Sequence, residues 1–168
     1  MSTRVPAKLV AAAALLAGSA LAVMAQEKFS ESPIREGAWV YPSEKIAPAT
    51  VEAFCQAGFS VHFADGGFFS LLNQPIGRMK KKLSVDTTGT CFFDAAKQTS
   101  LCVGEETDGR NKFPLKEENS FERDGKFLKL TTQVIDRETK RPATYVTYPM
   151  RCPDKVVREI LSKAIPPK

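Results

Sequence analysis

Alternating apolar and polar positions recur along the chain and predict short β-strands. In one run, Phe59, Val61 and Phe63 fall on one side of an extended segment. Ser60 and His62 fall on the other side, which we expect to point outward into solvent. Similar runs predict strands at residues 37–41, 68–72, 83–86, 90–94, 99–103, 127–135 and 143–148.

Asp-Gly pairs separate several of these runs and predict hairpin turns. They stand at residues 65–66 and 124–125, with a weaker case at 108–109. The second pair predicts a hairpin in which Arg123 lies opposite Lys126. Short strands at this spacing favour a mainly-β fold class, a small antiparallel β-barrel or sandwich built from hairpins.

Two segments follow a helical period instead. Residues 47–58 carry Pro48 in a first turn and Gly58 at the end, which predicts a short helix in the N-terminal half. Over residues 153–164 the apolar positions share one helical face, which predicts a C-terminal amphipathic helix. These positions are Val156, Val157, Ile160, Leu161 and Ala164.

The N-terminus has the three-part pattern of a cleaved secretory signal peptide over residues 1–25. Arg4 and Lys8 provide the positive region, and residues 9–23 the apolar one. That apolar run is shorter than the roughly 20 residues of a membrane-spanning helix. We therefore expect cleavage before Gln26 and no membrane span afterwards.

The rest of the chain predicts a flexible N-terminal arm over residues 26–36 and a single mainly-β domain over residues 37–168. Formal net charge is +5, and loss of Arg4 and Lys8 with the leader leaves +3. With 43% hydrophobic and 26% charged residues, the composition excludes collagen, a long coiled coil and a multispanning membrane protein. We expect a periplasmic or secreted protein.

The four cysteines all follow the leader, as expected for disulfides in an oxidising compartment. A two-residue turn at residues 96–97 would place Cys91 directly opposite Cys102, at about the Cβ separation that a disulfide needs. Cys55 would then pair with Cys152. Of the three connectivities that four cysteines allow, geometry favours this one.

The sequence offers little for catalysis. His62 is the sole histidine, so histidine chemistry has to use it. The mature chain has no nucleophile elbow, zinc-protease motif or phosphate-binding loop. We expect a protein that is not an enzyme, with no cofactor and no metal.

A group of carboxylates surrounds the third Asp-Gly pair. Its members are Glu105, Glu106, Asp108, Glu117 and Glu118. A glycosidase pair or, with Asn111, a calcium site are the functional interpretations. We favour a solvated turn, because nothing in the sequence indicates a raised pKa and the EF-hand spacing is absent.

The densest basic run contains Arg78, Lys80, Lys81 and Lys82. It is either a patch for an anionic partner or a lysine-protected strand edge or loop. Nucleic acid is excluded as a partner by export and by the lack of interleaved aromatic residues.

Aromatic side chains form either the core or an apolar pocket. The positions in question are Trp39, Phe59, Phe63, Phe68 and Tyr145. The Gly37-Ala38-Trp39 segment is similar to the G-x-W motif at the start of lipocalin-like barrels, over three residues, and carries no family assignment. We expect an exported non-enzymatic binding protein that holds a small apolar ligand in a β-barrel. The alternative is a protein-interaction role in the cell envelope, as a hydrolase inhibitor or an accessory subunit of a periplasmic complex.

Overall fold

The computed structural model describes residues 28–74, 82–108, 110–136 and 139–164. In chain order its elements are β1 (Gly37–Val40), a 3₁₀ turn (Pro48–Thr50), α1 (Val51–Ala57), β2 (Gly58–His62), β3 (Gly67–Gln74), β4 (Lys82–Asp94), β5 (Thr99–Thr107), β6 (Lys112–Asp124), β7 (Phe127–Ile135), β8 (Pro142–Thr147), β9 (Met150–Arg151) and α2 (Asp154–Ala164).

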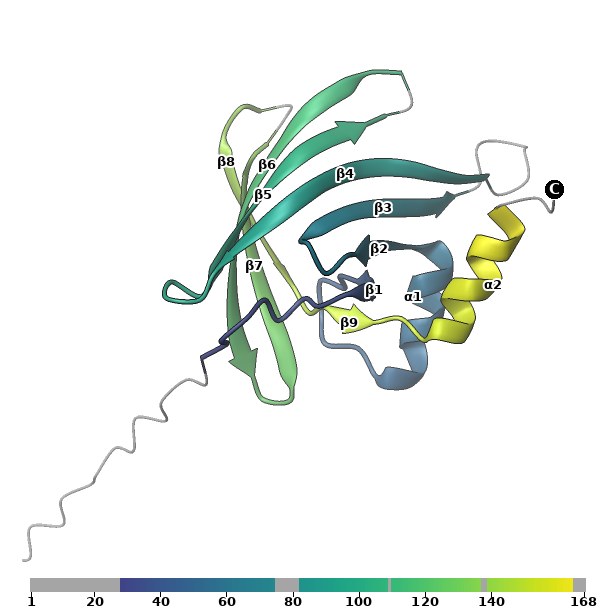
Figure 1. The fold of residues 1–168 in the computed structure, drawn as a ribbon, viewed down its shortest axis with the longest axis horizontal. Helices are drawn as coiled ribbons and strands as arrows, with labels where there is room; N and C mark the ends of the chain where they lie inside the picture. Colours follow the sequence, from purple (N-terminus) through teal and green to yellow (C-terminus); the bar gives the residue numbers. More distant parts are fainter. Residues whose placement is uncertain (1–27, 75–81, 109, 137–138, 165–168) are drawn as a thin grey trace, which may run out of the picture.

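All nine strands belong to one antiparallel sheet, in the order β8-β7-β6-β5-β4-β3-β2-β1-β9. The sheet curls into a half-barrel (Figure 1). The mainly-β prediction with two short helices is therefore confirmed, and the architecture is a single curled sheet instead of a two-sheet sandwich.

The two outer strands, β8 and β9, follow each other almost directly in the chain. Only Tyr148 and Pro149 separate them. The Tyr148 backbone N–H donates to the Pro42 carbonyl oxygen at 2.8 Å, beyond the end of β1. This connection draws the two edges of the sheet toward each other.

Two facing glycines allow the sheet to bend between β4 and β5. Gly89 lies directly opposite Gly104. A Cβ atom at Gly104 would lie 2.0 Å from the Thr88 carbonyl oxygen, so no larger residue fits without moving the backbone. Glycine at such a site permits the close approach that a strongly curled sheet requires.

The Asp-Gly pairs at residues 65–66 and 124–125 form the expected hairpins, but the register of the second differs from the prediction. Asp124 pairs with Phe127, and Arg123 lies opposite Leu128, not Lys126. Gly125 has a φ of 64° and occupies the first of the two turn positions, which moves the turn one residue along the chain.

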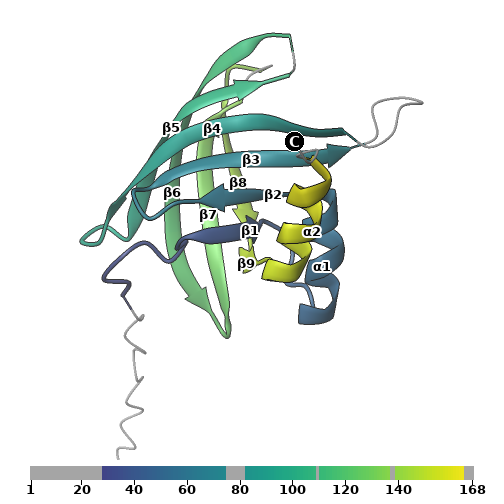
Figure 2. The same cartoon turned by 45° about the vertical axis from the view of Figure 1, so that its right-hand side comes forward.

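The hydrophobic core lies outside the half-barrel. Ala38, Val40, Phe59 and Leu71 project from β1, β2 and β3 toward Val51 and Cys55 of α1 and toward Val156 of α2. Figures 1 and 2 show the two helices side by side next to these strands. A disulfide between Cys55 and Cys152 joins them. The helices therefore cover the outer face of β1, β2 and β3 and leave the concave face of the sheet for other contacts.

Candidate functional site

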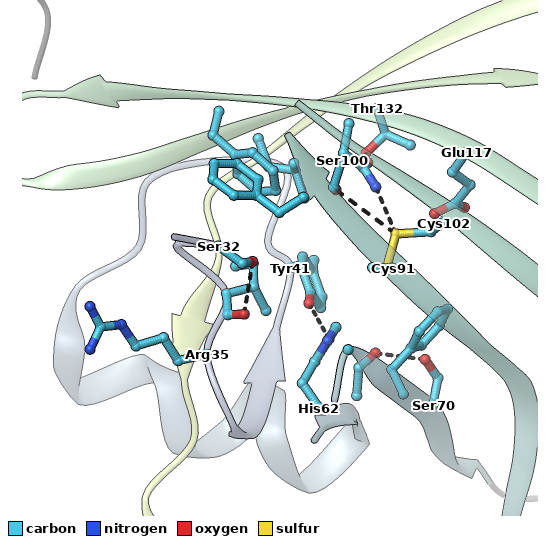
Figure 3. Close-up of a pocket in the computed structure, with 18 of the residues that line it drawn as sticks. Ser32, Arg35, Tyr41, His62, Ser70, Cys91, Ser100, Cys102, Glu117 and Thr132 are labelled. Atoms are coloured by element: carbon cyan, nitrogen blue, oxygen red, sulfur yellow. Dashed lines mark hydrogen bonds between the residues drawn. A yellow bond between two sulfur atoms is a disulfide. The ribbon is translucent and has the colours of Figure 1, made fainter. Parts of the chain in front are cut away.

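The concave face of the sheet encloses a cavity of about 690 Å³ (Figure 3). Strands β2 to β8 and Tyr41, just after β1, contribute its walls. The cavity lining combines aromatic and aliphatic side chains with hydroxyls, carboxylates and an amide.

The N-terminal arm forms one side of this cavity. Five of its residues line the cavity: Glu31, Ser32, Ile34, Arg35 and Glu36. The arm is fixed at Phe29, whose backbone N–H donates to Gln98 Oε1 at 2.7 Å. Gln98 Nε2 donates back to the Phe29 carbonyl oxygen at 2.9 Å, and the Arg123 guanidinium lies over the Phe29 ring. These contacts, here called the arm clamp, bring the segment to the turn between β4 and β5.

His62 faces this cavity and not bulk solvent, so the expectation of an outward, solvated ring is wrong. Its Nε2 lies 2.7 Å from the Tyr41 hydroxyl, and its ring stacks on Phe68 at a centroid distance of 5.5 Å. The predicted alternation holds within β2, but Phe63, just beyond that strand, lines the cavity together with His62 and does not join Phe59 and Val61. Phe59 and Val61 pack toward the core under the helices, so the polar side of β2 becomes the inner side.

Burial keeps this pair of side chains uncharged. It lowers the pKa of His62 to about 4, so the imidazole is neutral near pH 7. Burial, together with the nearby Glu117 charge, raises the pKa of the Tyr41 hydroxyl well above its usual range. Tyr41 and His62 therefore form a neutral hydrogen-bonded pair in the cavity wall.

Glu117 also faces the cavity, which corrects its assignment to a solvated turn. It stands directly opposite Cys102 on β5. Burial raises the pKa of its carboxyl, and the charge of Glu106 raises it further. The neighbouring Glu118 is exposed on the convex face. The missed signal is the alternation of β6, in which position 117 shares a face with Leu115 and Phe121.

Glu105 and Asp108, two further members of that carboxylate group, are solvated as predicted, although Glu105 lies in β5 and only Asp108 lies between β5 and β6. Glu105 is exposed and forms an ion pair with Lys112. The Asp108 carboxylate accepts hydrogen bonds from the backbone N–H groups of Arg110 and Asn111, as in an Asx turn. Glu106 is the exception, since it lines the cavity.

A disulfide between Cys91 and Cys102 forms part of the inner wall, with the connectivity expected from the sequence. The Nδ2 atom of the buried Asn119 side chain lies 3.3 Å from Cys102 Sγ. Its Oδ1 accepts a hydrogen bond from Thr132 Oγ1 at 2.7 Å. The middle of the wall is thus polar, rigid and internally hydrogen-bonded.

Apolar side chains gather at the end of the cavity near the arm clamp. The rings of Phe93 and Phe121 meet edge to face, with centroids 5.8 Å apart. Leu130 lies opposite Phe121, and Thr147 lies opposite Leu130 on β8. Thr147 Oγ1 is buried there without a hydrogen-bond partner among the described residues. The cavity therefore has an apolar end and a polar end.

The aromatic residues named from the sequence separate into three groups. Phe63, Phe68 and Tyr145 line the cavity. Phe59 instead belongs to the core under the helices. Trp39 donates its indole N–H to the Arg35 carbonyl oxygen and borders a second, smaller hollow beside α1.

The basic run is largely beyond the described residues. Arg78, Lys80 and Lys81 lie outside them, and Lys82 is described only as the first residue of β4. The patch for an anionic partner stays a prediction.

No family model, curated protein or solved structure matches this chain. Among the described residues, neither helix has the length and apolar character to cross a membrane. The same residues contain no group of three or more histidine, cysteine or acidic side chains placed to hold a metal ion.

Proposed function

We propose that this protein is an exported, non-enzymatic binding protein that holds a small amphipathic molecule in its concave cavity. The observation that carries the proposal is the cavity, whose volume falls within the range of about 300–1,000 Å³ typical of small-molecule sites. The polarity of its lining changes from one end to the other. The apolar end contains Phe93, Phe121 and Leu130, and the polar end contains Tyr41, His62 and Glu117. This gradient favours an amphipathic ligand over the purely apolar one expected from the sequence.

Export is supported by the covalent structure. Both disulfides are compatible with an oxidising compartment, and free cysteines are absent from the described residues. Together with the predicted leader, this favours a periplasmic or secreted location.

Binding without catalysis is supported by the state of His62. A general base works best with a pKa near the operating pH. At about 4, the pKa of His62 makes the ring a weak base, and its Nε2 already contacts Tyr41. The neutral pair is better suited to offering hydrogen bonds to a ligand.

The test is a titration with N-phenylnaphthylamine, a neutral apolar fluorophore whose emission rises on leaving water. Parent protein should bind it, and Phe93→Ala should weaken binding roughly tenfold because a buried aromatic contact is lost. Phe92→Ala is the matched control, since Phe92 is the preceding residue and lies 62% exposed on the convex face. Native mass spectrometry of protein from its own compartment would identify the bound molecule. Absence of fluorophore binding, or equal effects of the two variants, would rule the cavity out as the site.

A second candidate function, protein interaction in the cell envelope, is favoured by one observation on the convex face. Phe92 lies opposite Leu101, and Val103 follows on the same side of β5, all three at least 38% exposed. Exposed apolar clusters of this kind mark interaction surfaces. Tagged parent protein should capture an envelope protein. The tagged Leu101→Lys variant should not capture it and should still bind the fluorophore.

A further inference from the structure

We propose that the ligand is a cationic amphiphile, with an ammonium or guanidinium group held at Glu117 and an apolar body at the other end of the cavity. This inference rests on the proposed function and specifies the charge of its ligand. Three observations carry it: the sign of the charge on the wall, the separation of that charge from the apolar end, and the rings beside it.

Charge on the cavity wall is predominantly negative. Among the described lining residues there are four glutamates and one arginine. Arg35, the arginine, pairs with Glu31 at the exposed mouth. Glu106 and Glu117 are half-buried on the inner wall, where their charges are less screened by water.

This negative wall runs against the charge of the whole protein. Without its leader the chain carries a net charge of +3, yet the cavity concentrates acidic side chains. A cleft lined by one sign of charge focuses the field and attracts ligands of the opposite sign. An anionic ligand would be repelled by the Glu117 and Glu106 carboxylates, whereas a cation would be attracted to them.

The charged and apolar parts of the wall are well separated. Glu117 and Phe121 are four residues apart on β6, which corresponds to about 13 Å along a strand. Phe121 packs against Phe93 near the arm clamp. A ligand with a cationic head and an apolar tail matches this spacing, with the tail at the phenylalanines and the head at Glu117.

Aromatic and hydroxyl groups complete the polar end. Tyr41 is close enough to Glu117 for the carboxylate to affect its ionisation, and it is hydrogen-bonded to His62. Phe68 stacks behind His62. Ring faces attract cations, so these side chains favour an ammonium or guanidinium group beside the carboxylate.

The experiment compares decylamine, decanol and decanoate as competitors of N-phenylnaphthylamine on the parent protein, at about pH 7, where the amine is protonated. The three share a tail and differ in head charge. Decylamine should compete at least about tenfold more strongly than decanol, because a hydrogen bond to a charged group is stronger than one to a neutral group. Decanoate should compete least.

Two variants then locate the head group. Glu117→Gln should reduce competition by decylamine to about the level of decanol, and it should change competition by decanol much less than competition by decylamine. Glu118→Gln removes the same charge from the adjacent, outward-facing position. It should change neither competition by decylamine nor competition by decanol. Glu106→Gln removes the second inner carboxylate, which lies four residues along the strands from Glu117, and should weaken competition by decylamine less than Glu117→Gln does.

The outcomes separate the two proposals. If the parent protein does not bind the fluorophore, the proposed function itself fails. If the fluorophore binds but decanol or decanoate competes as strongly as the amine, the function stands and the cationic ligand is overturned. An equal loss of amine binding in Glu117→Gln and Glu118→Gln would overturn it as well, since surface attraction would then explain the preference.

Discussion

At the scale of single residues, the direction in which a side chain faces decides its chemistry. Glu117 and Glu118 are adjacent and chemically identical, yet the first lines a cavity and the second is exposed. Phe92 and Phe93 differ in the same way. The burial of the inward member changes its ionisation or its contacts, and the outward member serves as an internal control for it.

His62 should make stability depend on pH. Burial lowers its pKa to about 4 in the folded chain, against 6.5 for an exposed imidazole. As the pH falls from 6.5 to 4, His62 becomes protonated in the unfolded chain but stays neutral in the folded chain. The free energy of unfolding should therefore fall between pH 6.5 and 4, by up to about 3 kcal/mol.

Urea denaturation of parent and His62→Gln at the two ends of this range would measure the effect. Glutamine can still hydrogen-bond to Tyr41 but does not titrate. The variant should lose less stability than the parent on acidification, by the amount attributed to the ring. Because His62 is the sole histidine, the difference is specific to it. Equal losses in parent and variant would contradict burial of the imidazole.

At the scale of elements, the arm clamp connects a segment without regular secondary structure to a hairpin turn. Gln98 adopts a φ of 58°, and its side chain hydrogen-bonds the Phe29 backbone in both directions. Because Glu31, Ser32, Ile34, Arg35 and Glu36 line the cavity, this amide helps to hold one wall in place.

Gln98→Gly should release the arm without straining the turn, since glycine tolerates positive φ. We expect faster hydrogen exchange over residues 28–36, a several-fold faster release of bound fluorophore and a loss of about 1 kcal/mol of stability. Lys140→Gly is the matched control, because Lys140 is the other described non-glycine residue at positive φ and lies in the β7–β8 turn. Equal release rates in the two variants would show that the clamp does not control access.

At the scale of the whole molecule, the core and the cavity lie on opposite faces of the same strands. In β2, Phe59 enters the core under the helices while Ser60 and His62 face the cavity. Moving the core outside the half-barrel leaves the interior free to be polar. This arrangement allows a curled sheet, which usually fills its interior with apolar side chains, to carry polar and charged side chains on its concave face beside the apolar ones.

The sequence predicts the local parts of this arrangement and not the assignment of faces. Turn residues such as Asp65-Gly66 and the spacing of Cys91 and Cys102 act over a few residues, so the hairpins and the connectivity follow from them. Alternation shows that Phe59 and His62 face opposite ways, but which way is inward depends on where the helices pack. The arm clamp joins residues 69 apart and has no local signature.

The two disulfides should contribute unequally to stability because they close loops of different length. Cys55–Cys152 joins residues 97 apart, and Cys91–Cys102 joins residues 11 apart. In the chain-entropy model, replacing the first pair by alanine should cost about 2 kcal/mol more than replacing the second. Urea denaturation of the two double-alanine variants measures the difference, and hydrogen exchange should show loosening of α2 only when Cys55 and Cys152 are replaced. Equal costs would mean that the apolar face of α2, with Val156 against the sheet, holds the helix without its covalent link.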